Sequence, residues 1–151
     1  TLANMFASLF IYLSVSQVLS NPIGHAHNDY EKTSRAVWDA LAAGMSSVEA
    51  DVWLEGVTSG DPQLLVSHGW HERLPNRTLE QLYLEPLREF FTMGSAHSFG
   101  RTNPFWLHID VKSEAQTTWL KLDSVLMCYR DILQHHGYEN NPVRVVVGGN
   151  K

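Results

Sequence analysis

The chain has 151 residues, of which 44% are hydrophobic and 18% are charged, and its net charge is -5 with the histidines neutral. This length fits one domain around one core. The acidic balance, without any basic run, argues against nucleic acid as a partner and against a general attraction to anionic membranes. The single cysteine, Cys128, excludes an intramolecular disulfide and every multi-cysteine metal motif. Its place in an apolar helical pattern predicts a buried, inert thiol.

The N-terminal segment differs from the rest because residues 1–28 contain no Asp, Glu, Lys or Arg, and residues 5–20 are mostly apolar. We interpret residues 1–20 as a signal peptide, with Val18 and Ser20 as the small residues before a cleavage point. Asn76, in NRT, would then be a glycosylation acceptor in a secreted protein. The alternatives are a membrane anchor, although the apolar part is shorter than the ~20 residues of a membrane span, or a chain start other than the natural one.

Strand-like and helix-like stretches alternate along residues 21–151. The short apolar run NPIGHAH comes first, and a helix over residues 33–43 follows, closed by Gly44. Next come the strand SSVEADVWL and a further short extended piece, QLLVSH. Thr78 and Gln81 have the spacing of a capping box and open a helix that Pro86 restarts.

The second half of this pattern begins with the strand PFWLHIDVK. Ser113 and Gln116 then repeat the capping-box spacing and open a long helix ended by Gly137. PVRVVVGG is the last buried strand. The apolar face of the long helix is predicted to consist of Trp119, Leu122, Leu126, Tyr129 and Leu133.

The order β-α-β-α-β-α-β with apolar strands predicts an α/β fold with a parallel sheet covered by helices. Four such units could complete a doubly wound sheet. An eight-stranded barrel needs about 250 residues and would be roughly half present here. Since the chain stops at GGNK, directly after a strand, we expect a fragment or a truncated product whose missing half supplies the other strands.

Three carboxylates fall on common strand faces. Period-two geometry puts Glu49 and Asp51 on one face of their strand, and it puts Asp110 on a common face with His108 and Lys112. Carboxylates in a strand core must be paired, protonated or bound to a cation. Each of them alone could be a salt-bridge or cap residue, with Lys112 as a partner, but together they fit the oxygen shell of Mg²⁺ or Ca²⁺.

Two histidines follow strands at the ends where sites usually form. His25 follows the first strand and His68 ends LLVSH, and each imidazole could transfer a proton near neutral pH. A charge-neutralising metal and two imidazoles are the parts needed to break a phosphodiester by in-line displacement. His27 and His108 are candidates for lining the site. The other histidines, at positions 71, 97, 135 and 136, receive no chemical role.

The strings GHAHNDY, SVEADVW, LLVSH and LHIDVK occur in an order and spacing that resemble the superfamily of phosphatidylinositol phospholipase C-like phosphodiesterases. The closest resemblance is to the fungal altered inheritance of mitochondria protein six family, which also has a string similar to RTLEQLYLEPL. Glycerophosphodiester phosphodiesterases and spider-venom sphingomyelinases D are wider relatives. This resemblance implies a TIM-barrel fold, of which residues 21–151 form the N-terminal half.

The resemblance also implies roles for individual residues. His25 and His68 would be the general acid/base pair, and Lys112 would face the phosphate. Asn28 matches an asparagine near the site of the venom enzymes, and His27 joins it as a substrate-binding candidate. The implied metal ligands are Glu49, Asp51 and Asp110. The venom enzymes' disulfide loop cannot form with one cysteine.

The predicted function is that of a metal-dependent phosphoric diester hydrolase in lipid metabolism, acting on a glycerophosphodiester or phospholipid-like substrate, with peripheral contact to a membrane. One rival is a zinc-dependent amidohydrolase-type barrel that uses His25 and His27 as ligands. The other is an inactive half-barrel or binding module, for which exposed strand edges and self-association would be the sign.

Overall fold

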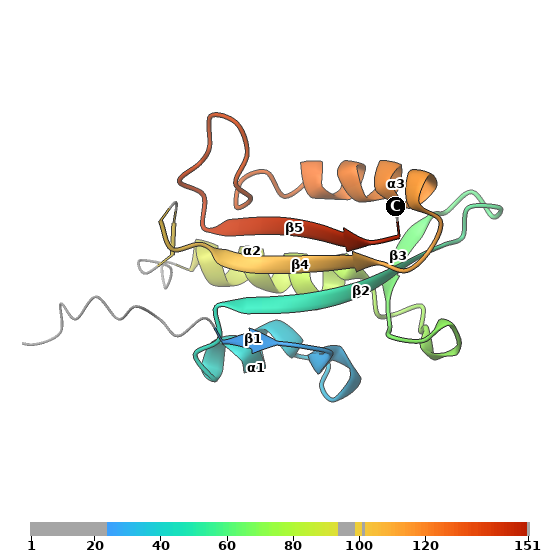
Figure 1. Ribbon diagram of the computed structural model, residues 1–151, viewed down its shortest axis with the longest axis horizontal. Helices are drawn as coiled ribbons and strands as arrows, with labels where there is room; N and C mark the ends of the chain where they lie inside the picture. Colours follow the sequence, from blue (N-terminus) through green and yellow to red (C-terminus); the bar gives the residue numbers. More distant parts are fainter. Residues whose placement is uncertain (1–23, 94–98, 101, 151) are drawn as a thin grey trace, which may run out of the picture.

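The computed structural model describes residues 24–93, 99–100 and 102–150 and shows a mixed α/β fold built on one sheet. Its parallel strands lie in the order β1-β2-β4-β5 (Figure 1), which confirms the predicted α/β class. The bounds of these strands are β1 His25–Ala26, β2 Ser47–Glu55, β4 Phe105–Val111 and β5 Val143–Gly149.

The extended piece QLLVSH forms a strand that runs against the others. This strand, β3, spans Gln63–Val66 and pairs antiparallel with the second half of β2, so that Val66 lies opposite Val52. The turn between the two strands holds Gly56 and Gly60 at positive φ, a conformation that glycine adopts without steric cost. Because β3 returns along β2, the residues that follow β3 lie beside the middle of β2.

The helices share one core with the apolar face of the sheet. Their bounds are α1 Ala36–Ala42, the π-helical turn η4 Glu80–Leu84, α2 Glu85–Thr92 and α3 Ala115–Met127, and short 3₁₀ turns lie at Asp29–Glu31 (η2) and Trp70–Glu72 (η3). Buried strand residues such as Val48, Leu107 and Ile109 contact this core. The alternate residues of β2 and β4 point to the opposite face, where the polar side chains lie.

Two local expectations for the first helices are supported. Gly44 follows α1 with a φ of 75°, and the amide of Met45 donates to the carbonyl of Ala40, as in a helix that ends in a left-handed glycine. The amide of Gln81 donates to Oγ1 of Thr78 at 3.2 Å, which is one half of the predicted capping box.

The predictions for the long helix need correction. Its N-cap is Glu114, whose carboxylate accepts from the amides of Gln116 and Thr117, while the hydroxyl of Ser113 is used by the amide of Leu54. The helix ends at Met127 rather than at Gly137, because the chain turns after residue 128 to begin its path back to β5. The apolar period continues through these turns, so Tyr129 and Leu133 remain buried outside the helix.

Two side chains of this region lie on the surface rather than in the core. Trp119 is 51% exposed, although it was predicted to belong to the apolar face of the helix. Cys128 is exposed, because the chain places it on the outer side of the C-terminus of α3, so the prediction of a buried thiol is wrong. Both predictions are wrong because a helical period in the sequence does not show which side of the helix packs against the sheet.

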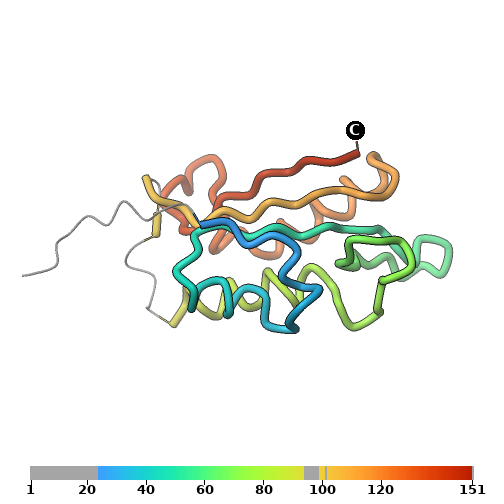
Figure 2. The backbone as a smooth tube through the Cα atoms, turned by 60° about the horizontal axis from the view of Figure 1, so that its bottom comes forward, coloured from blue at the N-terminus to red at the C-terminus, as the bar shows by residue number. Residues whose placement is uncertain are grey.

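The sheet is open, with β5 at one edge (Figure 2). β5 is less buried than the sequence predicted: Val143 is buried, but Val146 is 38% exposed. Within the part of the chain that the structure describes, no helix combines the length and apolar composition needed to cross a membrane. The predicted signal peptide, residues 1–20, lies outside the described residues.

Candidate active site

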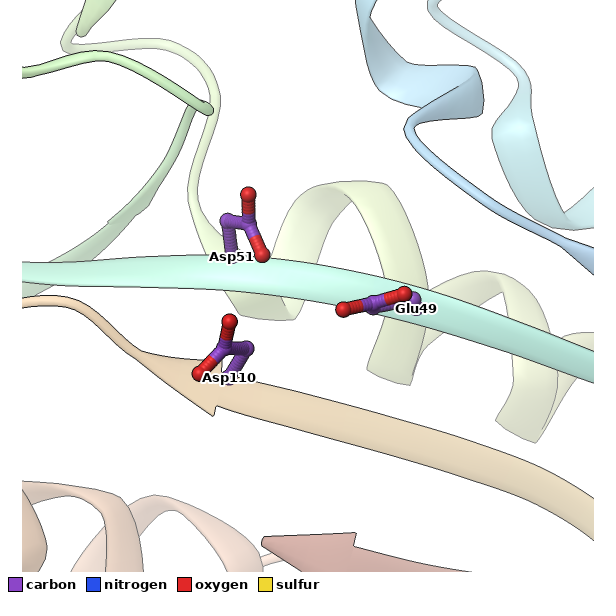
Figure 3. A group of neighbouring side chains, drawn as sticks. All are labelled: Glu49, Asp51 and Asp110. Carbon is purple, nitrogen blue, oxygen red and sulfur yellow. The ribbon is translucent and has the colours of Figure 1, made fainter. Parts of the chain in front are cut away.

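The three predicted acidic residues lie together on the polar face of the sheet. β2 and β4 are adjacent and parallel, with Asp51 directly opposite Asp110 and Glu49 opposite His108. One carboxylate oxygen from each of Glu49, Asp51 and Asp110 lies within 4.8 Å of the other two (Figure 3). The register of two neighbouring strands therefore turns two separate sequence patterns into one cluster.

Asp51 is the buried member of this cluster, with only 2% of its surface exposed. Its Oδ2 accepts a hydrogen bond from the hydroxyl of Tyr30 at 2.9 Å and lies 3.0 Å from Nδ1 of His68. Its Oδ1 has no hydrogen-bond partner and faces the ammonium of Lys112 at 3.5 Å. A buried carboxylate oxygen without a hydrogen bond is costly, and a bound cation would compensate that cost. The donor set thus fits a hard divalent cation.

Lys112 is the counter-ion of the acidic cluster. Its Nζ lies 2.5 Å from Oδ2 of Asp110 and 3.5 Å from Oδ1 of Asp51. Partial burial by itself lowers the pKa of Lys112, but the hydrogen bond and charge of Asp110 and the charge of Asp51 outweigh it and raise the pKa above 10.5. The lysine is therefore fully charged at neutral pH, beside the oxygens that fit a metal.

His25 is held on β1 at the other end of the cluster. Its Nδ1 lies 2.8 Å from Oγ of Ser47, the residue directly opposite in β2, and its Nε2 lies 3.3 Å from Oε2 of Glu49. The more exposed His27 brings its Nε2 within 3.3 Å of the same Glu49 oxygen. Both nitrogens of His25 thus have defined partners, which fixes the direction of its ring.

His68 reaches the site because β3 is antiparallel to β2. The amide of Ser67 donates to the carbonyl of Asp51, and this places the next residue, His68, beside the Asp51 carboxylate. A hydrogen bond from Nδ1 to that carboxylate would leave Nε2 as the unprotonated nitrogen in the neutral ring. A cavity of about 320 Å³ adjoins His68, lined by Tyr30, Glu31, Ser67, His68, Glu72 and Arg77.

His108 lies beneath this group and packs edge-on against His25, with ring centroids 5.2 Å apart. Partial burial lowers the pKa of His108, and the nearby His25 lowers it further, against the opposing effect of Glu49. Trp106 stacks on its other side. His108 thus lies between the rings of His25 and Trp106, and its role in lining the site stays a prediction.

Asn28 lies near the site, where its side chain contacts Tyr30, and its contact with substrate stays a prediction. It adopts a left-handed conformation, with φ 55° and ψ 28°, and its side-chain oxygen lies 3.0 Å from the hydroxyl of Tyr30. Tyr30 and Ser47 are site residues that the sequence analysis missed. Period-two geometry could have found Ser47, which shares a face with Glu49 and Asp51, whereas nothing in the local pattern pointed to Tyr30.

Comparison with protein families gives a match over residues 14–151 to the model described as AIM6-like phosphodiesterase domain. Two similar curated proteins are altered inheritance of mitochondria protein 6 from Eremothecium gossypii and its homolog from Arthroderma benhamiae. The first is 32% identical over 146 residues, covering 83% of this chain and 36% of the relative. The second is 31% identical over 151 residues, covering 83% of this chain and 46% of the relative.

A third relative, altered inheritance of mitochondria protein 6 from Kluyveromyces lactis, is 40% identical over 92 residues, which are 60% of this chain and 20% of the relative. The chain therefore spans less than half the length of these curated relatives. No solved structure gives a significant match.

Proposed function

Because the chain belongs to the family of AIM6-like phosphodiesterase domains, we propose that it carries the catalytic half of a metal-dependent phosphoric diester hydrolase. The observation that carries this proposal is the buried Oδ1 of Asp51, which accepts no hydrogen bond, inside a cluster of three carboxylates with imidazoles on both sides. The proposed substrate is a glycerophosphodiester or a phospholipid-like diester, and lipid metabolism is the proposed context.

Glu49, Asp51 and Asp110 would hold Mg²⁺ or Ca²⁺, because their oxygens match the preference of hard cations. A cation bound there supplies charge stabilisation for the phosphoryl oxygens in the transition state. Lys112 adds a second positive charge at the same place, and its ammonium can leave the Asp110 carboxylate to contact a phosphate oxygen.

The two histidines suit opposite proton-transfer roles. His68 directs Nδ1 at Asp51, so its Nε2 is the nitrogen that can take a proton from the attacking water or hydroxyl. His25 has Nε2 beside the Glu49 carboxylate, and it is proposed to return a proton to the leaving alcohol. His27, beside the same carboxylate, is proposed to contact the substrate.

The open sheet, with its carboxylates on the face opposite the apolar core, supports the proposal of a TIM-type barrel of which this chain forms the N-terminal half. Strands from other residues of the protein, or from a second copy of this chain, would cover that polar face. Secretion, with a membrane anchor as the alternative, stays a proposal based on the apolar residues 1–20, and peripheral membrane contact stays a proposal as well.

The direct test is hydrolysis of bis-p-nitrophenyl phosphate and of a lysophospholipid by the purified chain with Mg²⁺, Ca²⁺ or Zn²⁺ added, and with EDTA. We expect turnover with Mg²⁺ or Ca²⁺ that is lost in EDTA and in Asp51→Asn. The matched control is Asp123→Asn, which removes an exposed carboxylate of α3. Activity restored by Zn²⁺ alone would favour the amidohydrolase-type rival with His25 and His27 as ligands.

A well-folded chain that binds the metal but hydrolyses neither substrate would support the second rival, an inactive half-barrel or binding module.

A further inference from the structure

Tyr30 connects the loop after β1 to the centre of the acidic cluster. Its side chain is completely buried, and its hydroxyl lies between two polar groups: Oδ2 of Asp51 at 2.9 Å and the side-chain amide of Asn28 at 3.0 Å. The hydroxyl therefore donates to the carboxylate from inside the core.

A phenol has one proton, so it can donate to only one of these two neighbours. The buried carboxylate of Asp51 is the stronger acceptor, because hydrogen bonds to ionised groups are the stronger ones. Oδ1 of Asn28, at 3.0 Å, is the second acceptor within reach of this proton. The Tyr30 hydroxyl is thus held between the Asn28 side chain and the Asp51 carboxylate.

We propose that Tyr30 is a positioning residue that fixes the Asp51 carboxylate through Oδ2, so that Oδ1 faces the cation, and that Asn28 holds Tyr30 instead of contacting the substrate. This inference rests on the proposed metal-dependent function. It gives Asn28 a role different from the one that family resemblance implied.

Of the two groups that contact Oδ2, only Tyr30 is suited to a constant role. The side chain of His68 is 59% exposed, whereas Tyr30 is completely buried. Because its ring is enclosed by the core, Tyr30 holds the carboxylate in place whatever hydrogen bond His68 makes. Groups that orient a metal ligand in this way contribute about 10- to 100-fold to metal affinity.

The first experiment measures Mn²⁺ binding by electron paramagnetic resonance in Tyr30→Phe. Tyr83→Phe is the matched control, because Tyr83 is an equally buried tyrosine that also donates to β2, but to the backbone carbonyl of Glu49 at 2.7 Å. We expect a loss of about 10- to 100-fold in Mn²⁺ affinity for Tyr30→Phe and unchanged affinity for Tyr83→Phe. Asn28→Gly, which keeps the left-handed backbone accessible, should weaken binding in the same direction.

The second experiment is a double-mutant cycle of Tyr30→Phe and Asp51→Asn, measured by urea unfolding in EDTA. We expect non-additive shifts in the unfolding midpoint, because Tyr30→Phe removes the hydrogen bond and Asp51→Asn removes the charge that strengthens it. Additive shifts would overturn the inference. Equal Mn²⁺ affinities of Tyr30→Phe and Tyr83→Phe would overturn it as well. If the wild-type chain binds no Mn²⁺, the proposed metal-dependent function fails, and the cycle alone then decides whether Tyr30 holds Asp51.

Discussion

The side chains of the site compete for the same few oxygen atoms. Without a metal, the oxygens of Asp51 and Asp110 are neutralised by Lys112, and Oε2 of Glu49 lies beside His25 and His27. A cation at this place would displace some of these contacts and gain others. Removal of the lysine counter-ion should therefore lower metal-free stability and strengthen metal binding.

Lys112→Met is the clearest case of this competition. In EDTA we expect the free energy of unfolding to fall by about 1.5–3 kcal/mol, the usual value of a hydrogen bond to a charged group. The reason is that Asp51 and Asp110 lose their counter-ion. Added Mg²⁺ should stabilise this variant more than the wild type, as measured by thermal unfolding with and without metal. Lys121→Met, at a half-exposed position in α3, is the control. Equal stabilisation of variant and wild type by Mg²⁺ would contradict the prediction.

His108 gives a prediction for pH dependence. Since the folded state lowers its pKa below 6.5, the folded chain binds this proton less readily than the unfolded chain does. The contribution of His108 to stability is complete above pH 6.5 and is lost as the pH falls through the lowered pKa. We expect His108→Gln to have a shallower loss of stability below pH 6.5 than the wild type, measured by urea unfolding at several pH values.

An NMR titration of the wild-type imidazoles provides the direct check of this pKa. A midpoint for His108 at or above 6.5 would refute the assignment.

At the scale of elements, the end of β5 shows how closely its backbone approaches the acidic cluster. Gly149 has a φ of 90°, and a Cβ atom at this position would collide with Oδ1 of Asp110 and with the backbone of Val111. Its neighbour Gly148 has open space around the corresponding position. The strand can therefore accept a side chain at one of these glycines but not at the other.

Gly149→Ala should lower the free energy of unfolding by more than about 1 kcal/mol, because alanine at positive φ is strained and the new methyl group has no space. It should also weaken Mg²⁺ binding by displacing Asp110. Gly148→Ala is the matched control and should change stability by no more than about 0.5 kcal/mol. Urea unfolding and calorimetric Mg²⁺ titration of both variants test this, and similar results for the two glycines would contradict it.

At the scale of the whole molecule, the feature that bears on association is the open sheet with an apolar groove along its edge. Trp119 and Leu120 of α3 are 51% and 66% exposed, and they line a groove together with Val147 of β5. Exposed apolar surface next to an edge strand favours association.

We expect the chain of residues 1–151 to associate with itself in a concentration-dependent way, as measured by sedimentation velocity. Leu120→Glu should reduce this association without changing the far-UV circular dichroism spectrum, because the residue lies on the surface. Met93→Glu, an exposed apolar residue at the end of α2, is the control. A chain that stays monomeric at all concentrations would show that the groove does not drive association.

Much of the site was predictable from local sequence. The alternation of side chains along a strand is set by the pleat of the backbone, so the sequence alone placed Glu49 and Asp51 on one face and Asp110 on a polar face of another strand. The order of strands and helices likewise predicted a parallel α/β sheet, and this sheet is observed. A barrel stays a prediction, because the sheet of this chain is open.

The tertiary structure alone decided which of these groups meet. The alignment of Asp51 with Asp110 depends on the register of two strands whose paired residues are 59 positions apart in the chain, and the approach of His68 depends on β3 running antiparallel to β2. The burial of Tyr30 against Asp51 and the exposure of Cys128 depend on which side of a loop or helix faces the core. Local sequence determines the periodicity of side chains. The register of strands, their direction and the side of each element that faces the core result from the packing of segments distant along the chain.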